Sequence, residues 1–369
     1  MAVLITGATG HLGPHLLAEL LRAGDFDRFY VVARRTRQQN AESRVRAAED
    51  VARAQLARRG LRPHRACVVP LDADCLDLVA SDRSMLDSIT VVVHAAADTR
   101  FGAPLDDLRS ANVSGTIAMC RLAAHCRRLQ QFLFVSTGCV AGRRSGVIPE
   151  GILDDSAGFA NAYEQSKWEA ERAVCGSGLP LRIARLTTCV GSHETGYVHR
   201  FGALHHMLRW TARGLVPMIP ATEESRLDLI STDVAAAWLA RACVRPIDGL
   251  AVSHVALGAE RISLAALLDV VMPLLVGEDR RRITRPMLVE PAVFHSFNQM
   301  VRVSGDALFV RVQQSAAAVL PALLHPKTYE TSRAEQCWGG PLPHPDWTLL
   351  MKRVVAFGRE HWVREAAHA

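Results

Sequence analysis

The sequence contains no apolar run long enough to cross a membrane, no metal-binding cysteine pattern and no low-complexity tract. A membrane helix needs about 18 or more apolar residues in a row, so we expect no membrane span. The nine cysteines form no CxxC pair and lie mostly in apolar surroundings, which predicts buried, reduced thiols, no metal site and a cytoplasmic location. The first apolar segment begins at Ala2, leaving no room for a signal peptide. No repeat or nucleic-acid-binding motif is present, so we expect no nucleic-acid partner.

The composition is that of a globular protein with a large core. The chain has 369 residues, of which 49% are hydrophobic and 22% are charged. This length suits one large domain, or one domain with an additional lobe. The formal net charge is +6, carried by arginines spread among acidic residues. That distribution indicates a solvated surface or sites for anionic ligands.

The most informative stretch is the first turn of the chain. An apolar strand, Ala2–Ile5, leads into the glycine-rich segment TGATGHLG, and an amphipathic helix follows. Three glycines at this spacing allow a tight turn, close approach to a pyrophosphate, and close packing of helix against strand. The helix N-terminus then faces the anion with its N–H groups. The residues expected to contact a dinucleotide here are Gly7, Thr9, Gly10, His11, Leu12 and Gly13.

The end of the second predicted strand indicates which dinucleotide binds. This strand, residues 29–33, ends in ARRTR and carries no carboxylate to hold a ribose 2′-hydroxyl. The guanidinium groups of Arg34 and Arg35 suit a 2′-phosphate by charge and shape. The sequence therefore predicts NADPH rather than NADH, although solvated loop charges are the alternative reading of these arginines.

Further apolar strands are predicted at 66–71, 90–93, 131–135 and 181–186. The third strand of the chain ends in DAD, where Asp74, with Cys75 beside it, is our choice for the adenine contact. Asp72 is nearly as suitable, and either carboxylate can instead cap the next helix. The strand at 90–93 ends in small residues that leave room for a cofactor: Ala95, Ala96 and Ala97. We expect the His94 that precedes them to be structural rather than an acid or base.

Strands that alternate with helices, including a long polar helix at 41–60, predict an α/β fold with a doubly wound parallel sheet. We place an NADP-binding Rossmann domain at 1–195 and a mostly helical substrate lobe at 196–369. Whether part of 226–260 joins the sheet is left open. In the lobe we expect helices near 198–213 and 231–243, an apolar helix from Ile262 that Pro273 ends or kinks, and an amphipathic helix at 347–364.

Two segments carry side chains suited to hydride chemistry. Tyr163 and Lys167 are four residues apart in a predicted helix and so share one face. We expect the ammonium to lower the pKa of the phenol, which then exchanges a proton with a carbonyl oxygen as hydride arrives. Lys167 can also bind the nicotinamide ribose. Thr137, which follows Ser136 at a strand end, is placed to hold the same oxygen.

In this order along the chain, the motifs TGATGHLG, HAAAD, NVSGT, VSTGCVAG and YEQSK resemble the extended short-chain dehydrogenase/reductases over about residues 1–240. The resemblance implies a Rossmann domain and a catalytic set of Thr137, Tyr163 and Lys167. It makes Asn112 a supporting residue near the cofactor. It places Leu186 and Thr187 beside the nicotinamide, although many members have proline at the position of Leu186.

Segments at 70–74, 92–101 and 183–196 are similar to thioester-reductase domains and fatty-acyl-CoA reductases. Those relatives reduce an acyl thioester with NADPH, so the resemblance implies an acyl group on CoA or on a carrier as substrate, and a place in secondary metabolism. The apolar segments 264–276 and 316–324 are candidates for the wall of an acyl or aromatic pocket, or for ordinary helix core. The resemblance also suggests a monomer or a homodimer.

Several alternatives stay open. One is a ketone, aldehyde or aromatic-ring reductase, or a hydroxysteroid-type dehydrogenase. A sugar-nucleotide epimerase or dehydratase is disfavoured by Arg34 and Arg35, because epimerases usually retain NAD. A non-catalytic NADP sensor on the same fold typically lacks the tyrosine–lysine pair, which this chain keeps.

Overall fold

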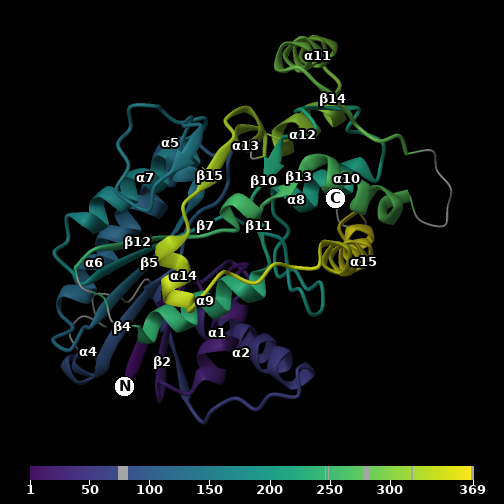
Figure 1. The fold of residues 1–369 in the computed structure, drawn as a ribbon. Coiled ribbons are helices and arrows are strands. Elements are labelled where there is room, and N and C mark those ends of the chain that lie inside the picture. Colours follow the sequence, from purple (N-terminus) through teal and green to yellow (C-terminus); the bar gives the residue numbers. More distant parts are fainter. Residues whose placement is uncertain (74–81, 246, 248, 277–282, 317–318, 367–369) are drawn as a thin grey trace.

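The computed structural model describes residues 1–73, 82–245, 247, 249–276, 283–316 and 319–366 (Figure 1). Its centre is a seven-stranded sheet in which every pairing is parallel, with the order β12-β7-β5-β4-β1-β2-β3. The strands are β1 (Ala2–Thr6), β2 (Arg28–Ala33), β3 (Cys67–Asp72), β4 (Ile89–His94), β5 (Gln131–Thr137), β7 (Leu181–Leu186) and β12 (Ala251–Val255). The strand order reverses between β1 and β4, which is where this fold binds ligands. The predicted doubly wound parallel sheet is confirmed.

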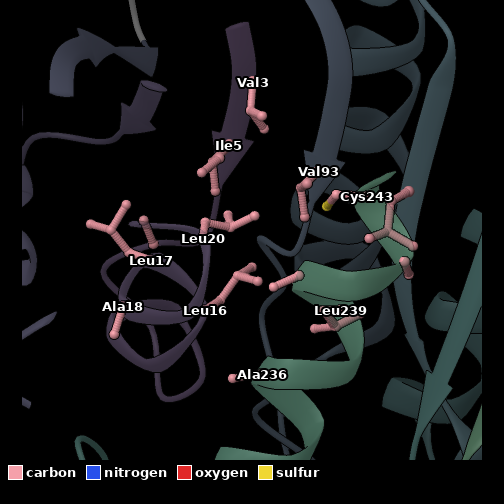
Figure 2. Packing of buried hydrophobic residues seen from close by; sticks show 14 of the residues in the cluster. Val3, Ile5, Leu16, Leu17, Ala18, Leu20, Val93, Ala236, Leu239 and Cys243 are labelled. Atoms are coloured by element: carbon pink, nitrogen blue, oxygen red, sulfur yellow. The ribbon is translucent and has the colours of Figure 1, made fainter. Parts of the chain in front are cut away.

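Helices cover both faces of the sheet, because alternate residues of each strand point to opposite sides. Val3 and Ile5 of β1 belong to one buried cluster, while Ala2 and Leu4 belong to another. The first face carries α1 (Gly13–Ala23), α2 (Ala41–Arg58) and α9 (Thr232–Val244). The second carries α4 (Arg83–Ser88), α6 (Gly115–Ala124) and α7 (Ala162–Cys175). Figure 2 shows α1 and α9 packed together over β1 and β4.

The predicted elements of the first half match the structure within a few residues. One difference lies before α6, where the predicted helix start is a π-helical turn, η2 (Ser110–Ser114), that follows α5 (Leu105–Arg109). Strand β12 lies within the range 226–260 that the sequence left open. Helix α9 starts with Ser231 accepting from the Val234 N–H, so the capped helix expected there is present.

The second half is mostly helical, as expected, and has a buried core of its own. Its helices are α8 (Ala203–Thr211), α10 (Leu264–Val276), α11 (Pro291–Ser304), α12 (Ala307–Ala316), α13 (Leu320–Leu324), α14 (Ser332–Trp338) and α15 (Trp347–Ala366). Of the two expected effects of Pro273, a helix end is wrong, because α10 continues through it to Val276, and a kink stays a prediction. Its apolar residues pack into the core on both sides of the proline.

Four short strand pairs were not predicted as pairs, although the sequence predicts a short strand near 226–230, just before the helix at 231–243. They are β6 (Gly146–Ile148) with β15 (Lys327–Tyr329), β8 (Thr188–Cys189) with β11 (Leu229–Ile230), β9 (Met218–Pro220) with β14 (Met287–Val289), and β10 (Arg226–Leu227) with β13 (Ile262–Ser263). Strands of two or three residues are too short to show alternation. After β15 the chain returns to the Rossmann region, where Ala334 and Cys337 of α14 join the core of the first sheet face. The division at residue 195 stays a prediction.

Within the described residues, no helix combines the length and apolar character that spanning a membrane requires.

Candidate active site

The glycine turn lies at the carboxyl end of β1, next to the segment that follows β4. Gly7 has a φ of +80°, and a Cβ there would lie 2.5 Å from the Ala95 carbonyl carbon. A Cβ on Gly13 would lie 2.2 Å from the Ala8 carbonyl carbon. At Gly10 a Cβ would meet only the Gly7 oxygen, at 3.2 Å. No side chain caps α1. Its Gly13 N–H donates to the Gly10 oxygen at 3.2 Å and Pro14 has no N–H, so the attraction of an anion to this end comes from the helix dipole and the remaining N–H groups of the turn.

A buried histidine joins this turn to the end of β4. The Ala96 N–H donates to Thr6 Oγ1 at 3.1 Å, and Thr6 Oγ1 lies 2.7 Å from His94 Nδ1. On the other side, His94 Nε2 lies 3.0 Å from Thr116 Oγ1, whose own proton goes to the Asn112 carbonyl oxygen. Thr116 therefore accepts, which places the ring proton on Nε2 and leaves Nδ1 to accept from Thr6. Burial lowers the pKa of His94 to about 3, so this neutral ring is structural, as expected.

Asn112 holds the other end of the segment that follows β4. Its Oδ1 accepts from the Asp98 N–H at 2.7 Å, and its Nδ2 donates to the Asp98 carbonyl and to Ser166 Oγ, both at 3.0 Å. The side chain is buried and sits within the π-helical turn η2, a local irregularity often found at functional sites. Residues 95–97 are thus fixed at both ends, and the supporting role near the cofactor that the resemblance implies for Asn112 stays a prediction.

The three predicted catalytic side chains meet at the end of β5. Thr137 ends the strand, and its hydroxyl accepts from the Cys139 N–H at 3.2 Å. Thr137 is close enough to the Tyr163 phenol to lower its pKa, and the phenol ring lies 4.7 Å from the ring of Phe101. Lys167 Nζ donates to the Val135 carbonyl oxygen at 3.1 Å. The predicted spacing on α7 therefore brings the phenol and the ammonium to the same strand end.

Burial controls the protonation of both groups. It raises the pKa of Tyr163 well above its usual value, aided by Cys139 and Glu164 and opposed by Thr137. Burial also lowers the pKa of Lys167 to about 8, against an opposing effect of Glu171. The charge of Lys167 does not contribute to the shift in the pKa of Tyr163. The expected lowering of the phenol pKa by Lys167 is therefore wrong for the structure described here.

The N-terminus of α7 is fixed by its own sequence. Asn161 Oδ1 accepts from the Glu164 N–H at 3.0 Å, and the Glu164 carboxylate accepts from the Ala160 N–H at 2.9 Å. This reciprocal arrangement resembles a capping box, which stabilises the first turn of a helix. It fixes the turn of α7 that carries Tyr163.

Arginines gather where β2 ends. Arg35 pairs with Asp72 at 3.0 Å, so Asp72 is engaged by a guanidinium. The sequence analysis missed Arg44 of α2, whose guanidinium donates to the Arg34 carbonyl oxygen and, at 2.9 Å, to Thr9 Oγ1. Burial, together with the charges of Arg200 and Arg34, lowers the pKa of Arg44. Arg44 is one of many polar residues in a long helix, so the sequence did not indicate that it contacts the glycine turn. The predicted adenine contacts Asp74 and Cys75 lie outside the described residues.

The end of β7 is held by a second missed residue. Leu186 is buried, and Thr187 Oγ1 donates to Asp228 Oδ1 at 3.0 Å. The Asp228 carboxylate also accepts from the N–H groups of Leu257 and Gly258, both at 2.9 Å. Burial raises the pKa of Asp228 to about 6. The sequence alone assigns Asp228 no role, because Thr187, the residue that donates to it, is 41 residues away.

Strand β15 brings two further side chains to the site. A Cβ on Gly138, the residue after Thr137, would lie 2.7 Å from the Tyr329 ring. The Tyr329 ring also lies 5.0 Å from that of His254. Lys327 is close enough to Glu164 and Cys139 for their charges to raise its pKa, although burial lowers that pKa overall. Both residues lie in the KTYETS segment, to which the sequence analysis gave no role.

The eight described cysteines are free, and the described residues include no cluster of three or more histidines, cysteines or carboxylates that could hold a metal ion.

A glycine turn at the switch point of a parallel sheet, with a Tyr-x-x-x-Lys helix after β5, defines an extended short-chain dehydrogenase/reductase. The chain belongs to the family of NAD-binding domains described as Male sterility protein, which matches residues 5–239.

Similar proteins extend this assignment. The chain is 33% identical over 225 residues to an isonitrile lipopeptide synthase of Streptomyces coeruleorubidus, covering 58% of this chain and 15% of that protein. It is 27% identical over 282 residues to fatty acyl-CoA reductase 1 of Homo sapiens, covering 64% and 54%. The terminal R domain of the myxalamid PKS-NRPS pathway shares the fold, with a TM-score of 0.76 at 23% identity over 98% of this chain and 91% of that one. The chain thus spans only part of the curated relatives it matches.

Proposed function

We propose that the protein reduces an acyl thioester to an aldehyde and a free thiol, with NADPH as the reductant. The observation that carries this proposal is the convergence of Thr137, Tyr163 and Lys167 where β5 ends, next to the glycine turn and the segment 95–97. The family and the two curated relatives named as a lipopeptide synthase and an acyl-CoA reductase support the thioester class. The acyl group is proposed to arrive as a CoA ester or on a carrier.

The residues present fit a nicotinamide dinucleotide. At the N-terminus of α1 no side-chain cap competes with a pyrophosphate for the positive end of the helix dipole, and Gly10 keeps side-chain atoms away from that approach. The fixed segment 95–97 leaves only small side chains at the sheet's switch point. When bound, the cofactor supplies the hydride.

The phosphorylated form of the cofactor is favoured by the arginines where β2 ends. Arg44 bridges the Arg34 carbonyl and Thr9, and its charge lies near those of Arg34 and Arg200. Guanidinium groups gathered in this way repel one another, and a dianionic 2′-phosphate would relieve that repulsion. We therefore assign Arg34 and Arg44 to the 2′-phosphate.

The chain's own groups supply the proton and orient the carbonyl. Thr137 holds the carbonyl oxygen, and Tyr163 gives that oxygen a proton while the carbonyl carbon accepts a hydride. The C–S bond then breaks, so that the aldehyde carbonyl reforms and the sulfur leaves as a thiol after taking up the oxygen's proton. Lys167 supports the return of a proton to Tyr163. The balance is one thioester, one NADPH and one proton giving one aldehyde, one thiol and one NADP⁺.

Substitution of the phenol tests this assignment. Tyr163→Phe removes the proton donor, and general acids contribute about 10²- to 10⁴-fold, so kcat should fall at least about 100-fold. NADPH binding, measured by the quenching of protein fluorescence, should be retained. Tyr30→Phe in β2 is the matched control and should keep normal turnover. Unchanged turnover in Tyr163→Phe would remove Tyr163 from the mechanism.

A further inference from the structure

The C-terminal half contains an apolar cavity of about 930 Å³, part of which opens to solvent. It lies between α8, α10, α11, α12 and α13, and β9 closes one side. Leu268 and Val271 line it from α10, Val312 from α12 and Leu323 from α13. Both apolar segments singled out in the sequence, 264–276 and 316–324, therefore contribute to its wall.

The polarity of the lining selects the ligand. Among the residues that the structure describes, none with a charged side chain lines the cavity, and the polar ones are Thr211, Asn298 and Gln313. Thr211 donates to the Met207 carbonyl at 2.8 Å. Gln313 Nε2 donates to Asn298 Oδ1 at 3.0 Å, so these two amides bind one another. A phosphate, a carboxylate or a peptide would lose its hydration in this cavity without compensating partners, whereas a hydrocarbon loses nothing.

Two segments of the chain contribute one residue to the cavity lining and another, a few positions later, to the surroundings of the reaction site. Leu227 lines the cavity, and the next residue, Asp228, accepts a hydrogen bond from Thr187 at the end of β7. On the other side, Leu323 lines the cavity four residues before Lys327. Four residues span at most about 14 Å. Strand β15 then places Tyr329 against Gly138, next to Thr137.

We propose that this cavity holds the hydrocarbon tail of an aliphatic acyl thioester while its carbonyl lies at Thr137 and Tyr163. The inference rests on the proposed function and adds the substrate class, an aliphatic acyl chain without polar substituents. Each buried methylene strengthens binding about fourfold, so kcat/KM should rise by about that factor per added methylene until the cavity is full.

A chain-length series with a cavity-filling variant tests the proposal. The wild-type protein should prefer dodecanoyl-CoA over acetyl-CoA by more than 100-fold in kcat/KM. Val312→Phe places a ring in the cavity and should shift the optimum to shorter chains. The matched control is Val303→Phe, because Val303 on α11 is 89% exposed, and it should keep the wild-type profile. Equal turnover of acetyl- and dodecanoyl-CoA, or an unshifted optimum in a folded Val312→Phe variant, would overturn the proposal.

A binding measurement separates this inference from the proposed reaction. The fluorescent fatty acid cis-parinaric acid should bind the wild-type protein at one site and be displaced by dodecanoyl-CoA but not by acetyl-CoA. If this displacement occurs without any thioester reduction, the reaction is wrong and the acyl cavity stands. If thioesters are reduced but the probe does not bind, the cavity assignment is wrong and the reaction stands. The wild-type measurements decide the question even if Val312→Phe fails to fold.

Discussion

At the scale of single residues, the role proposed for Lys167 predicts how the reaction rate depends on pH. Burial lowers the pKa of this ammonium to about 8 in the folded protein, so it is charged below that pH and loses its proton above it. Proton return to Tyr163 requires the charged form. We therefore expect kcat/KM to fall as the pH rises through about 8, measured as the initial rate of NADPH oxidation at fixed acyl-CoA.

The conservative variant Lys167→Arg provides the control for this pH profile. A guanidinium stays charged beyond pH 10, so the fall near pH 8 should disappear even if the maximal rate is lower. A fall that persists near pH 8 in this variant would assign it to another group.

The residues that the sequence located are those whose geometry is local. Tyr163 and Lys167 share a helix face, and Thr137 follows a buried strand, so spacing and chain order were sufficient to group them. Arg44 and Asp228 were missed, because each acts on a partner from a distant element. The raised pKa of Tyr163 also escaped prediction, since it comes from tertiary burial rather than from the neighbouring lysine.

At the scale of elements, long apolar strands were predictable because a parallel sheet buries them on both faces. Strand β7 lies where its sequence placed it, from Leu181 to Leu186. Strand β15 was not predictable, because its three residues gain strand structure only by pairing with β6, about 180 residues earlier. The helical lobe was predictable in type but not in bounds, and helix α10 passes through the proline expected to end or kink it.

Glu150 links two of these elements and gives a stability prediction. Its buried carboxylate accepts from the N–H groups of His254, Arg333 and Ala334, and so joins β12 to the first turn of α14. Glu150→Ala leaves these donors without their acceptor. Removing a partner costs about 1–3 kcal/mol per buried group, so the free energy of unfolding should fall by about 3 kcal/mol.

Urea denaturation followed by circular dichroism measures this change. Asp106→Ala is the control, because Asp106 is 94% exposed and its weak ion pair contributes little to stability. A loss in Glu150→Ala no larger than in the control would contradict the capping role of Glu150.

At the scale of the whole molecule, the chain joins a cofactor-binding sheet to an apolar cavity. The first 245 residues build six of the seven strands of the sheet and the catalytic helix α7. The later helices α10, α11, α12 and α13 enclose the cavity together with the earlier α8 and β9, and the chain then returns through β15 and α14 to the sheet. This return places the Tyr329 ring against Gly138, the residue that follows Thr137.

The most direct test of the central claim is the stoichiometry of the reaction. Purified protein is given dodecanoyl-CoA with NADPH, and the loss of reduced cofactor is measured together with the release of free thiol. We predict equal amounts of NADPH consumed and CoA thiol released, with NADH at least about tenfold less effective because of Arg34 and Arg44. Turnover of the matching aldehydes or ketones without any thiol release, or equal use of NADH, would contradict the account.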